Sequence, residues 1–174
     1  MHEITTSGIA VLADRQDGQT PVSGVLIGEG DVTTGLSGER TRWPGDVLAE
    51  MEGMFEGKPL TMADSDDPEQ HVGVTLTDDG PALTGAISLD EKVGEITSTV
   101  YEPGVGVLYE GFVADEDAAG AVDSGLAQVS PVVMREAEPV DDDGNLLEVT
   151  SVSSGRDVAI VASGAAPSTE INVG

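Results

Sequence analysis

The chain has 174 residues, of which 33 are acidic and 7 are basic, so its formal net charge at pH 7 is -26. This balance argues against nucleic-acid binding, because binding to phosphates requires clustered Lys and Arg. The absence of cysteine excludes disulfides, thiolate nucleophiles and Cys-based zinc sites.

The N-terminal region predicts the first strands. The apolar runs GIAVLAD and VSGVLIG are separated by RQDGQTP, where Asp17-Gly18 and Pro21 favour a turn, so a hairpin or β-meander is expected. The same region has neither a basic n-region nor a long apolar segment, and no run in the chain approaches the roughly 20 apolar residues of a membrane span. We therefore expect no secretion signal and no membrane association.

A change of period then predicts a helix over WPGDVLAEMEGMFEGKP. Pro44 suits its first turn and Gly57 its exit. Its apolar residues fall on one helical face: Val47, Leu48, Met51, Met54 and Phe55.

From Val72 the apolar residues alternate with a period of two, which predicts a series of antiparallel strands with one buried face. The strands are HVGVTLT, ALTGAISL, GEITSTV and GVLYEGFV, with turns at DDGP and EPG. The next segment, ADEDAAGAVDSG, predicts a short helix that Asp115 caps and Gly125 closes. This helix leads into a strand within SGLAQVSPVV, which carries Ser130.

The C-terminal part predicts an acidic loop, EAEPVDDDGN, followed by two more strands, LLEVTSV and DVAIVAS. The last stretch, GAAPSTEINVG, is small and polar enough for a frayed tail or linker. Because 174 residues suit one hydrophobic core, we expect a single domain over residues 1–166 and a polar tail or linker remnant over residues 167–174.

The acidic composition indicates a halophilic source. A net charge of -26 repels itself in ordinary buffer, whereas salt near 1 M shortens the Debye length to about 3 Å. An acidic disordered chain is the alternative, but Val, Leu, Ile and Ala recur in alternating runs of strand length, which favours a folded protein.

Ser130 stands directly before Pro131, and two explanations compete. Either the hydroxyl is a nucleophile on a rigid strand, or the Ser-Pro pair marks a strand end where a ladder hydrogen bond is given up. A nucleophilic serine needs a base within hydrogen-bond reach, usually an imidazole. Of the two histidines, His2 and His71, the second stands at the start of a predicted strand and is far enough upstream to meet Ser130 across a sheet. Otherwise His71 is an ordinary surface residue.

Other chemical motifs are weaker. The chain has no nucleophile elbow, Walker loop, HExxH zinc motif or dinucleotide-binding glycine pattern. The acidic run ADSDDPEQ, residues 63–70, could bind a hard cation, but it lacks calcium-loop spacing and also fits a solvated loop. We expect no metal and no other cofactor.

Six stretches taken in order carry a family resemblance: GVLIGEGDVTTGLSG, FEGKPLT, VGEIT, GVGVLYEGFVAD, SGLAQVSPVVM and LLEVTSVSSGRDVAIVASGAAPSTEI. Together they resemble the prohead maturation proteases of tailed viruses, distant relatives of the herpesvirus assemblin proteases. The resemblance runs from Ser7 to Ile171. It implies a mainly β fold with a few helices, a small antiparallel β-barrel of the prohead protease/assemblin type, closed or partly closed.

The resemblance also implies a nucleophile and a base. The serine of the G-x-x-x-V-S strand corresponds to Ser130, and the base is a histidine shortly after G-K-P. At that place this chain has Met62, Ala63 and Asp64, so His71 is the remaining candidate and loss of the base is the alternative.

Two further roles follow from the resemblance. Glu148 in LLEVTSV is expected to orient the imidazole, with Asp157 as the second choice, because a buried carboxylate stabilises the imidazolium formed in the transition state. Arg156, in a turn at SSGRD, is expected at the oxyanion, or else pairs with a neighbouring acid.

The function implied is a serine endopeptidase that processes capsid and scaffold proteins during virus head maturation in a halophilic archaeal host. One alternative, motivated by the position after GKPLT, is an inactive protease-like component of the shell; another is a halophilic β-rich binding module unrelated to viruses. Capsid and scaffold proteins are the expected partners, in a homo-oligomer or capsid assembly, with no nucleic acid and no membrane. The expected location is the procapsid or virion in the host cytoplasm.

Overall fold

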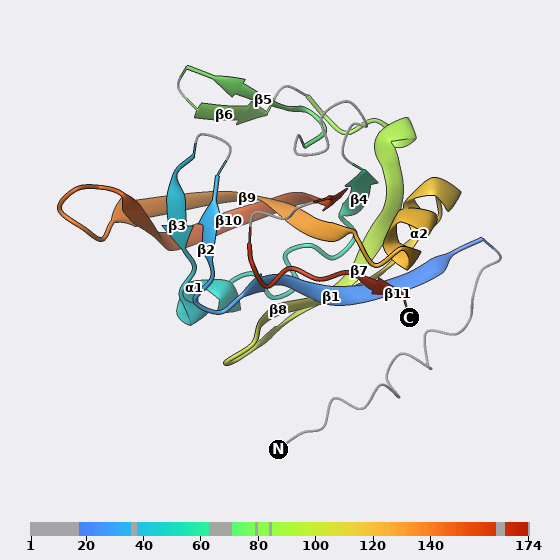
Figure 1. Ribbon diagram of the computed structural model, residues 1–174, viewed down its shortest axis with the longest axis horizontal. Coiled ribbons are helices and arrows are strands. Elements are labelled where there is room, and N and C mark those ends of the chain that lie inside the picture. Colours follow the sequence, from blue (N-terminus) through green and yellow to red (C-terminus); the bar gives the residue numbers. More distant parts are fainter. Residues whose placement is uncertain are drawn as a thin grey trace.

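The computed structural model describes residues 18–35, 38–62, 71–78, 80–83, 85–162 and 166–173. One curled sheet forms an open half-barrel, and a small hairpin lies apart from it (Figure 1). The sheet contains β1 (Thr20–Gly28), β2 (Val32–Thr34), β3 (Arg40–Arg42), β4 (Pro59–Met62), β7 (Lys92–Glu102), β8 (Gly106–Val113), β9 (Gln128–Pro139), β10 (Leu146–Val161) and β11 (Asn172–Val173). The hairpin is β5 (Val74–Thr77) with β6 (Gly80–Leu83), and the helices are α1 (Gly45–Ala49), α2 (Glu116–Asp123) and the 3-10 turn η2 (Leu89–Glu91).

The sheet runs in the order β11-β1-β8-β7-β4-β10-β3-β2, with β9 on the other side of β10. β10 is the organising strand, because β9 pairs with it antiparallel while β3 and β4 pair parallel with its two halves. The mainly β class predicted from the sequence is confirmed. The closed form of the expected barrel is wrong, because no pairing joins the end strands within the described residues.

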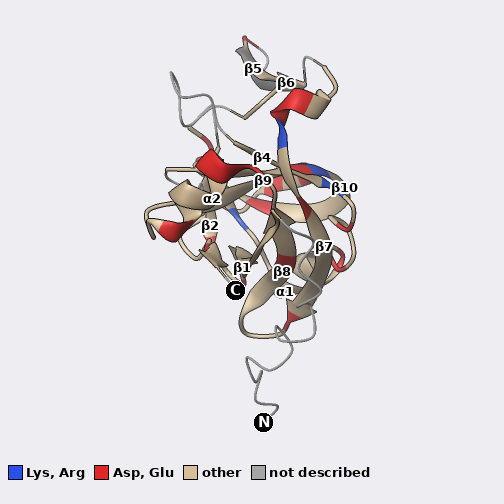
Figure 2. Cartoon of the chain, turned by 90° about the vertical axis from the view of Figure 1, so that its right-hand side faces the viewer, with Lys and Arg blue, Asp and Glu red and all other residues tan. Residues whose placement is uncertain are grey.

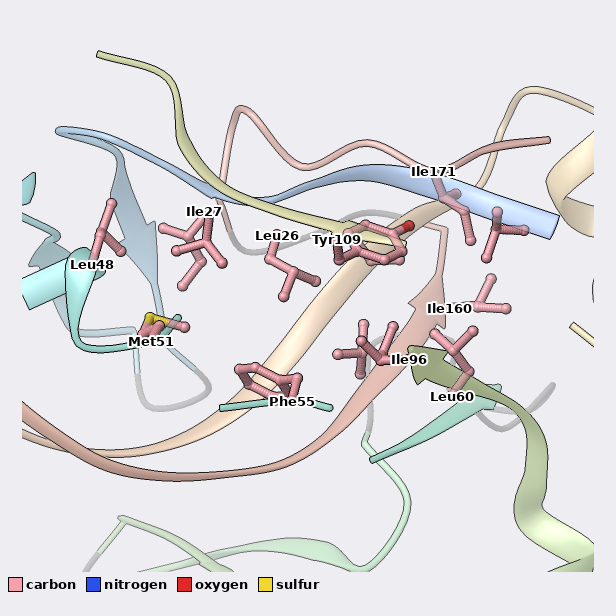
Figure 3. Close-up of a cluster of buried hydrophobic side chains, with 14 of the residues drawn as sticks. Leu26, Ile27, Leu48, Met51, Phe55, Leu60, Ile96, Tyr109, Ile160 and Ile171 are labelled. Atoms are coloured by element: carbon pink, nitrogen blue, oxygen red, sulfur yellow. The ribbon is translucent and has the colours of Figure 1, made fainter. Parts of the chain in front are cut away.

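The hydrophobic core lies inside the curl of the sheet, where side chains from the strands meet those of the α1 segment (Figure 3). The members that are fully buried include Leu26, Leu48, Met51, Phe55, Leu60, Ile96, Val107, Val129 and Val158. The alternating pattern read from the sequence matches the buried face in β8, where Val107, Tyr109 and Val113 are buried. In β7 a bulge after Ile96 shifts the pattern, so that Thr99 is buried and Val100 is exposed.

The predicted helix over WPGDVLAEMEGMFEGKP is much shorter in the structure. Only Gly45–Ala49 is helical. Gly53 adopts φ +70°, and its N-H donates to the Thr99 carbonyl of β7 at 3.0 Å. Gly57 N-H likewise donates to the Ile96 carbonyl at 2.9 Å. These bonds to a neighbouring strand replace helical ones, while the predicted apolar face still packs in the core.

The short helix before the Ser130 strand is confirmed as α2. The Asp115 carboxylate accepts a hydrogen bond from Ala118 N at 2.8 Å, which satisfies a first-turn donor. Ala118 and Val122 are buried. Gly125 follows with φ +72°, the left-handed conformation that ends helices.

The two C-terminal strands expected from LLEVTSV and DVAIVAS are one strand, β10, with three irregularities in its pairing with β9. The turn expected at SSGRD is therefore wrong: Ser154 to Arg156 lie within β10. Each bulge adds one residue and bends the strand without ending it. In the sequence, a bulge interrupts the alternating pattern just as a turn does. β9 also extends to Pro139, into the predicted acidic loop.

The expected polar tail is part of the fold. Ile171 and Thr169 are buried, and β11 pairs with β1 through Val22 and Ser23. Ser168 donates to the Asp31 carboxylate from both its backbone N-H and its hydroxyl. A few buried side chains and a short edge pairing thus dock residues 166–173, although the segment is polar in composition.

Acidic positions recur along the elements in view, with few basic ones among them (Figure 2). Within the described residues, no helix is long and apolar enough to cross a membrane. The first predicted strand, GIAVLAD, and the acidic run at residues 63–70 lie outside the described residues.

Candidate functional site

Ser130 lies on β9, on the face of the sheet turned away from the core. Its neighbour Val129 is fully buried in the core, and successive side chains of a strand point to opposite faces. Ser130 pairs with Ala159 of β10, and Ala159 pairs with Thr61 of β4. Paired residues share a face, so three adjacent strands present Ser130, Ala159 and Thr61 together on the outer surface.

This outer face is nevertheless covered: Ser130 is 6% exposed, and Thr61 and Ala159 are fully buried. The segment that begins at His71 and leads into the β5–β6 hairpin lies against it, above β9 and β10 in Figure 1. The site is thus a contact between the sheet and the loop of His71, Val72 and Gly73 that leads into the hairpin.

His71 meets Ser130 directly. Its Nε2 lies 3.0 Å from Ser130 Oγ, although 59 residues separate the two in the sequence. The structure therefore brings together the two residues that the sequence analysis paired. Their contact satisfies the distance required between a nucleophile and its base.

The protonation state of His71 suits a base. Burial, followed by the nearby charge of Arg156, lowers the pKa of His71 from 6.5 to about 4, so the imidazole is neutral at pH 7. To accept the serine proton at Nε2, a neutral imidazole must carry its hydrogen on Nδ1. His71 Nδ1 is buried and has no hydrogen-bond partner among the described residues.

Asp157 shares the outer face, two residues before Ala159 on β10. Its side chain is fully buried, and its Oδ2 accepts a hydrogen bond from Thr61 Oγ1 at 3.1 Å. Oδ1 lies 3.6 Å from Arg156 Nε and has no hydrogen bond within the part of the chain that the structure describes. Burial raises the pKa of Asp157, and the Arg156 charge and the Thr61 hydrogen bond oppose this rise.

Arg156 reaches from β10 to the backbone that follows His71. Its Nη2 donates to the Val72 carbonyl at 2.7 Å, and its Nη1 to the Gly73 carbonyl at 3.4 Å. The guanidinium expected at an oxyanion thus binds backbone carbonyls beside the Ser-His pair. It also contacts the neighbouring acid Asp157, as the alternative interpretation expected.

The structure does not bring Glu148 to this site. Its carboxylate pairs with Arg42, with Oε2 2.7 Å from Nε and 2.6 Å from Nη2. Glu148 pairs with Glu138 of β9, eight residues along that strand from Ser130, which at about 3.3 Å per residue is roughly 26 Å. The assignment of Glu148 as the partner of His71 is wrong because β10 is one long strand. Asp157, the second choice, is the carboxylate that lies at the site.

Sequence reasoning missed two members of the site. Thr61 follows the GKP segment and holds the Asp157 carboxylate, and Gly73 allows the guanidinium to approach the backbone. The signal for Gly73 was its place just after His71, since a glycine next to a functional residue often permits a close contact.

The position of Ser130 before Pro131 also has a structural explanation. β9 pairs with β10 alone among the described strands, so it is an edge strand. An edge strand tolerates proline because one side of its backbone needs no ladder partner. Pro131 therefore lies within β9 and does not mark its end.

Among the described residues, no group of three or more His, Asp or Glu side chains could hold a metal ion. No protein-family model matches the chain, and none of the curated proteins is recognisably similar to it.

Proposed function

We propose that this protein is a serine endopeptidase of the prohead maturation type, with Ser130 as its nucleophile and His71 as its general base. The 3.0 Å contact between His71 Nε2 and Ser130 Oγ supports the chemistry. The ordered sequence stretches that resemble prohead proteases support the substrate class, which is the capsid and scaffold proteins of a tailed virus with a halophilic archaeal host. The acidic composition supports that host.

The reaction proceeds through an acyl-enzyme. Ser130 Oγ attacks the carbonyl carbon of the scissile peptide while its proton passes to His71 Nε2. The imidazolium returns this proton to the leaving amine as the C-N bond breaks. Water, deprotonated by the same Nε2, then attacks the ester, and the proton returns to Ser130 Oγ as the C-O bond breaks.

Ser130→Ala tests the nucleophile. In molar salt, the variant is expected to lose both labelling by an active-site fluorophosphonate and processing of a co-expressed capsid precursor. The matched control is Ser153→Ala, which removes an exposed hydroxyl of β10 whose hydrogen bond among the described residues is to the Met134 carbonyl. Processing by the Ser130→Ala variant at the wild-type rate would remove Ser130 as the nucleophile.

His71→Gln tests the base separately. The variant is expected to lower the labelling rate of Ser130 by about 10²- to 10⁴-fold, the usual contribution of a positioned general base. The same rate in wild type and variant would mean that another group accepts the proton.

A second candidate function is a protease-like structural component of the virion shell that has lost catalysis. It is favoured by the burial of Ser130, which is 6% exposed, and by the absence of a partner for His71 Nδ1 among the described residues. Copy number separates the two functions. A processing enzyme is present in few copies per mature particle, whereas a shell component is stoichiometric with the lattice and Ser130 resists the fluorophosphonate.

A further inference from the structure

Arg156 owes its orientation to a bulge in β10. Gly155 pairs with Val133 and Asp157 pairs with Val132, so Arg156 is the additional residue between two regular pairs. A bulge re-aims the side chain it carries. Here it lets the guanidinium reach the loop that lies against the outer face of the sheet, and only 15% of that side chain is exposed.

The Arg156 guanidinium binds the backbone of the two residues that follow His71. Val72 and Gly73 each offer a carbonyl oxygen to a different terminal nitrogen, at 2.7 and 3.4 Å. Gly73 has φ +63°, and a Cβ at that position would lie 2.7 Å from Arg156 Nη2. The guanidinium thus occupies the space that a side chain would need, and two donors in a fixed fork define the position of this backbone.

The Asp157 carboxylate is the counter-charge of the buried Arg156 guanidinium. This carboxylate is fully buried, lies 3.6 Å from Arg156 Nε and is itself held by the Thr61 hydroxyl. A buried guanidinium without a counter-charge would be costly. Two consecutive residues of β10 therefore connect the central sheet to the loop that carries His71.

Few contacts among the described residues fix the orientation of the His71 imidazole ring. Its hydrogen bond within the described residues is the one to Ser130, and its Nδ1 has no partner there. In a Ser-His-Asp triad, a carboxylate at Nδ1 orients the ring. Within the described part of the chain, the remaining constraint on the ring position is the backbone that follows His71, which Arg156 binds.

We propose that Arg156 is a positioning residue that holds His71 against Ser130 by binding the Val72 and Gly73 carbonyls, and that buried Asp157 holds Arg156 in turn. We call Arg156 and Asp157 together the Arg156–Asp157 clamp. Its catalytic role rests on the proposed Ser130-His71 chemistry. The arrangement differs from a triad in a testable respect, because a cation, rather than an anion, is the charge that acts on the imidazole.

Among the described residues, few charged groups lie around His71, which allows a clean test. Arg156 and Asp157 face the site from β10, and Glu91 of η2 is the other described acid that interacts with Arg156. The chain has two histidines, so a His2→Gln background leaves His71 as the one imidazole. Its titration by NMR in molar salt reports on the clamp whether or not the protein is an enzyme.

In that background, Arg156→Met is expected to raise the pKa of His71 from about 4 toward 6.5, because the cation is removed and the released loop gains water. Fluorophosphonate labelling of Ser130 is expected to slow by about tenfold to a hundredfold at pH 8, even though the imidazole is a stronger base, since misplacement by about 1 Å has such effects. Arg156→Lys keeps the charge without the fork and should slow labelling with a smaller change in the pKa.

The control is Arg42→Met, which removes an equal charge from the distant Arg42-Glu148 pair and should leave the titration and labelling unchanged. Gly73→Ala is the second variant, because its Cβ would displace the guanidinium without removing it; it should slow labelling as Arg156→Met does. If Arg156→Met and Gly73→Ala both fold and leave the titration and labelling of His71 and Ser130 as in the His2→Gln parent, the clamp is refuted. If the parent is never labelled, the endopeptidase fails, and the titration alone then decides the clamp.

Discussion

His71 makes the stability of this protein sensitive to mild acid, and the size of the effect follows from its pKa. The pKa is about 4 in the folded protein and 6.5 for an ordinary histidine. The unfolded chain therefore binds more protons than the folded one between these values. The stabilising contribution of neutral His71 is complete above 6.5 and is lost as the pH falls through 4.

The difference of about 2.5 pH units corresponds to about 3.4 kcal/mol, at about 1.36 kcal/mol per unit. By about pH 5, roughly 2 kcal/mol of this is lost already, because the unfolded histidine is almost fully protonated there and the folded one is not. This pH lies above the ordinary range of Asp and Glu, so most carboxylates remain ionised.

The assay is urea denaturation of wild type and His71→Gln in molar KCl, at about pH 7.5 and about pH 5. Carboxylate titration is common to both proteins and cancels in the comparison. The free energy of unfolding of wild type, relative to His71→Gln, should fall by about 2 kcal/mol between the two conditions. A constant difference across this range would refute the buried, neutral state of His71.

Three further predictions concern the fold. Gly155→Ala should lower the free energy of unfolding by about 1–3 kcal/mol, because its Cβ would lie 2.6 Å from the Phe55 ring. In the Gly155→Ala background, Phe55→Leu should restore part of the lost stability. Additive effects of the two substitutions in a double-mutant cycle would contradict the clash. Asp115→Ala should cost about 1 kcal/mol of stability through loss of the α2 cap to Ala118 N, and urea midpoints of the two proteins check it. Raising KCl from about 0.1 to 2 M should raise the thermal midpoint, since the net charge of -26 is then screened, and a flat or falling midpoint would count against the halophilic interpretation.

The sequence predicted the elements whose signals are local. The period-two runs HVGVTLT, GEITSTV and GVLYEGFV correspond to β5, β7 and β8, and α2 lies between Asp115 and Gly125 as expected. The strand expected over ALTGAISL is mostly wrong, because β6 ends at Leu83 and Leu89 begins η2. The chemistry of the Ser130 site was also available from the sequence, because a nucleophilic serine needs a base and the chain offers only two imidazoles.

The errors occurred where a contact distant in sequence decided the outcome. α1 ends early because carbonyls of β7 take the N-H groups of Gly53 and Gly57. The residues after Ala166 dock because β1 offers them an edge. In each case the backbone groups found partners on another element, which a window of neighbouring residues does not contain.

By itself, the sequence determined the mainly β class, the acidic surface and the one Ser-His pair that chemistry allows. Only the tertiary structure decided which charged groups accompany that pair. Because β10 is one continuous strand, Glu148 lies far from Ser130 and pairs with Arg42. A bulge in the same strand directs Arg156 toward the backbone after His71. The physical reason is that strand register and bulges are set by pairing across the sheet, and a shift of one residue changes which side chains share a face.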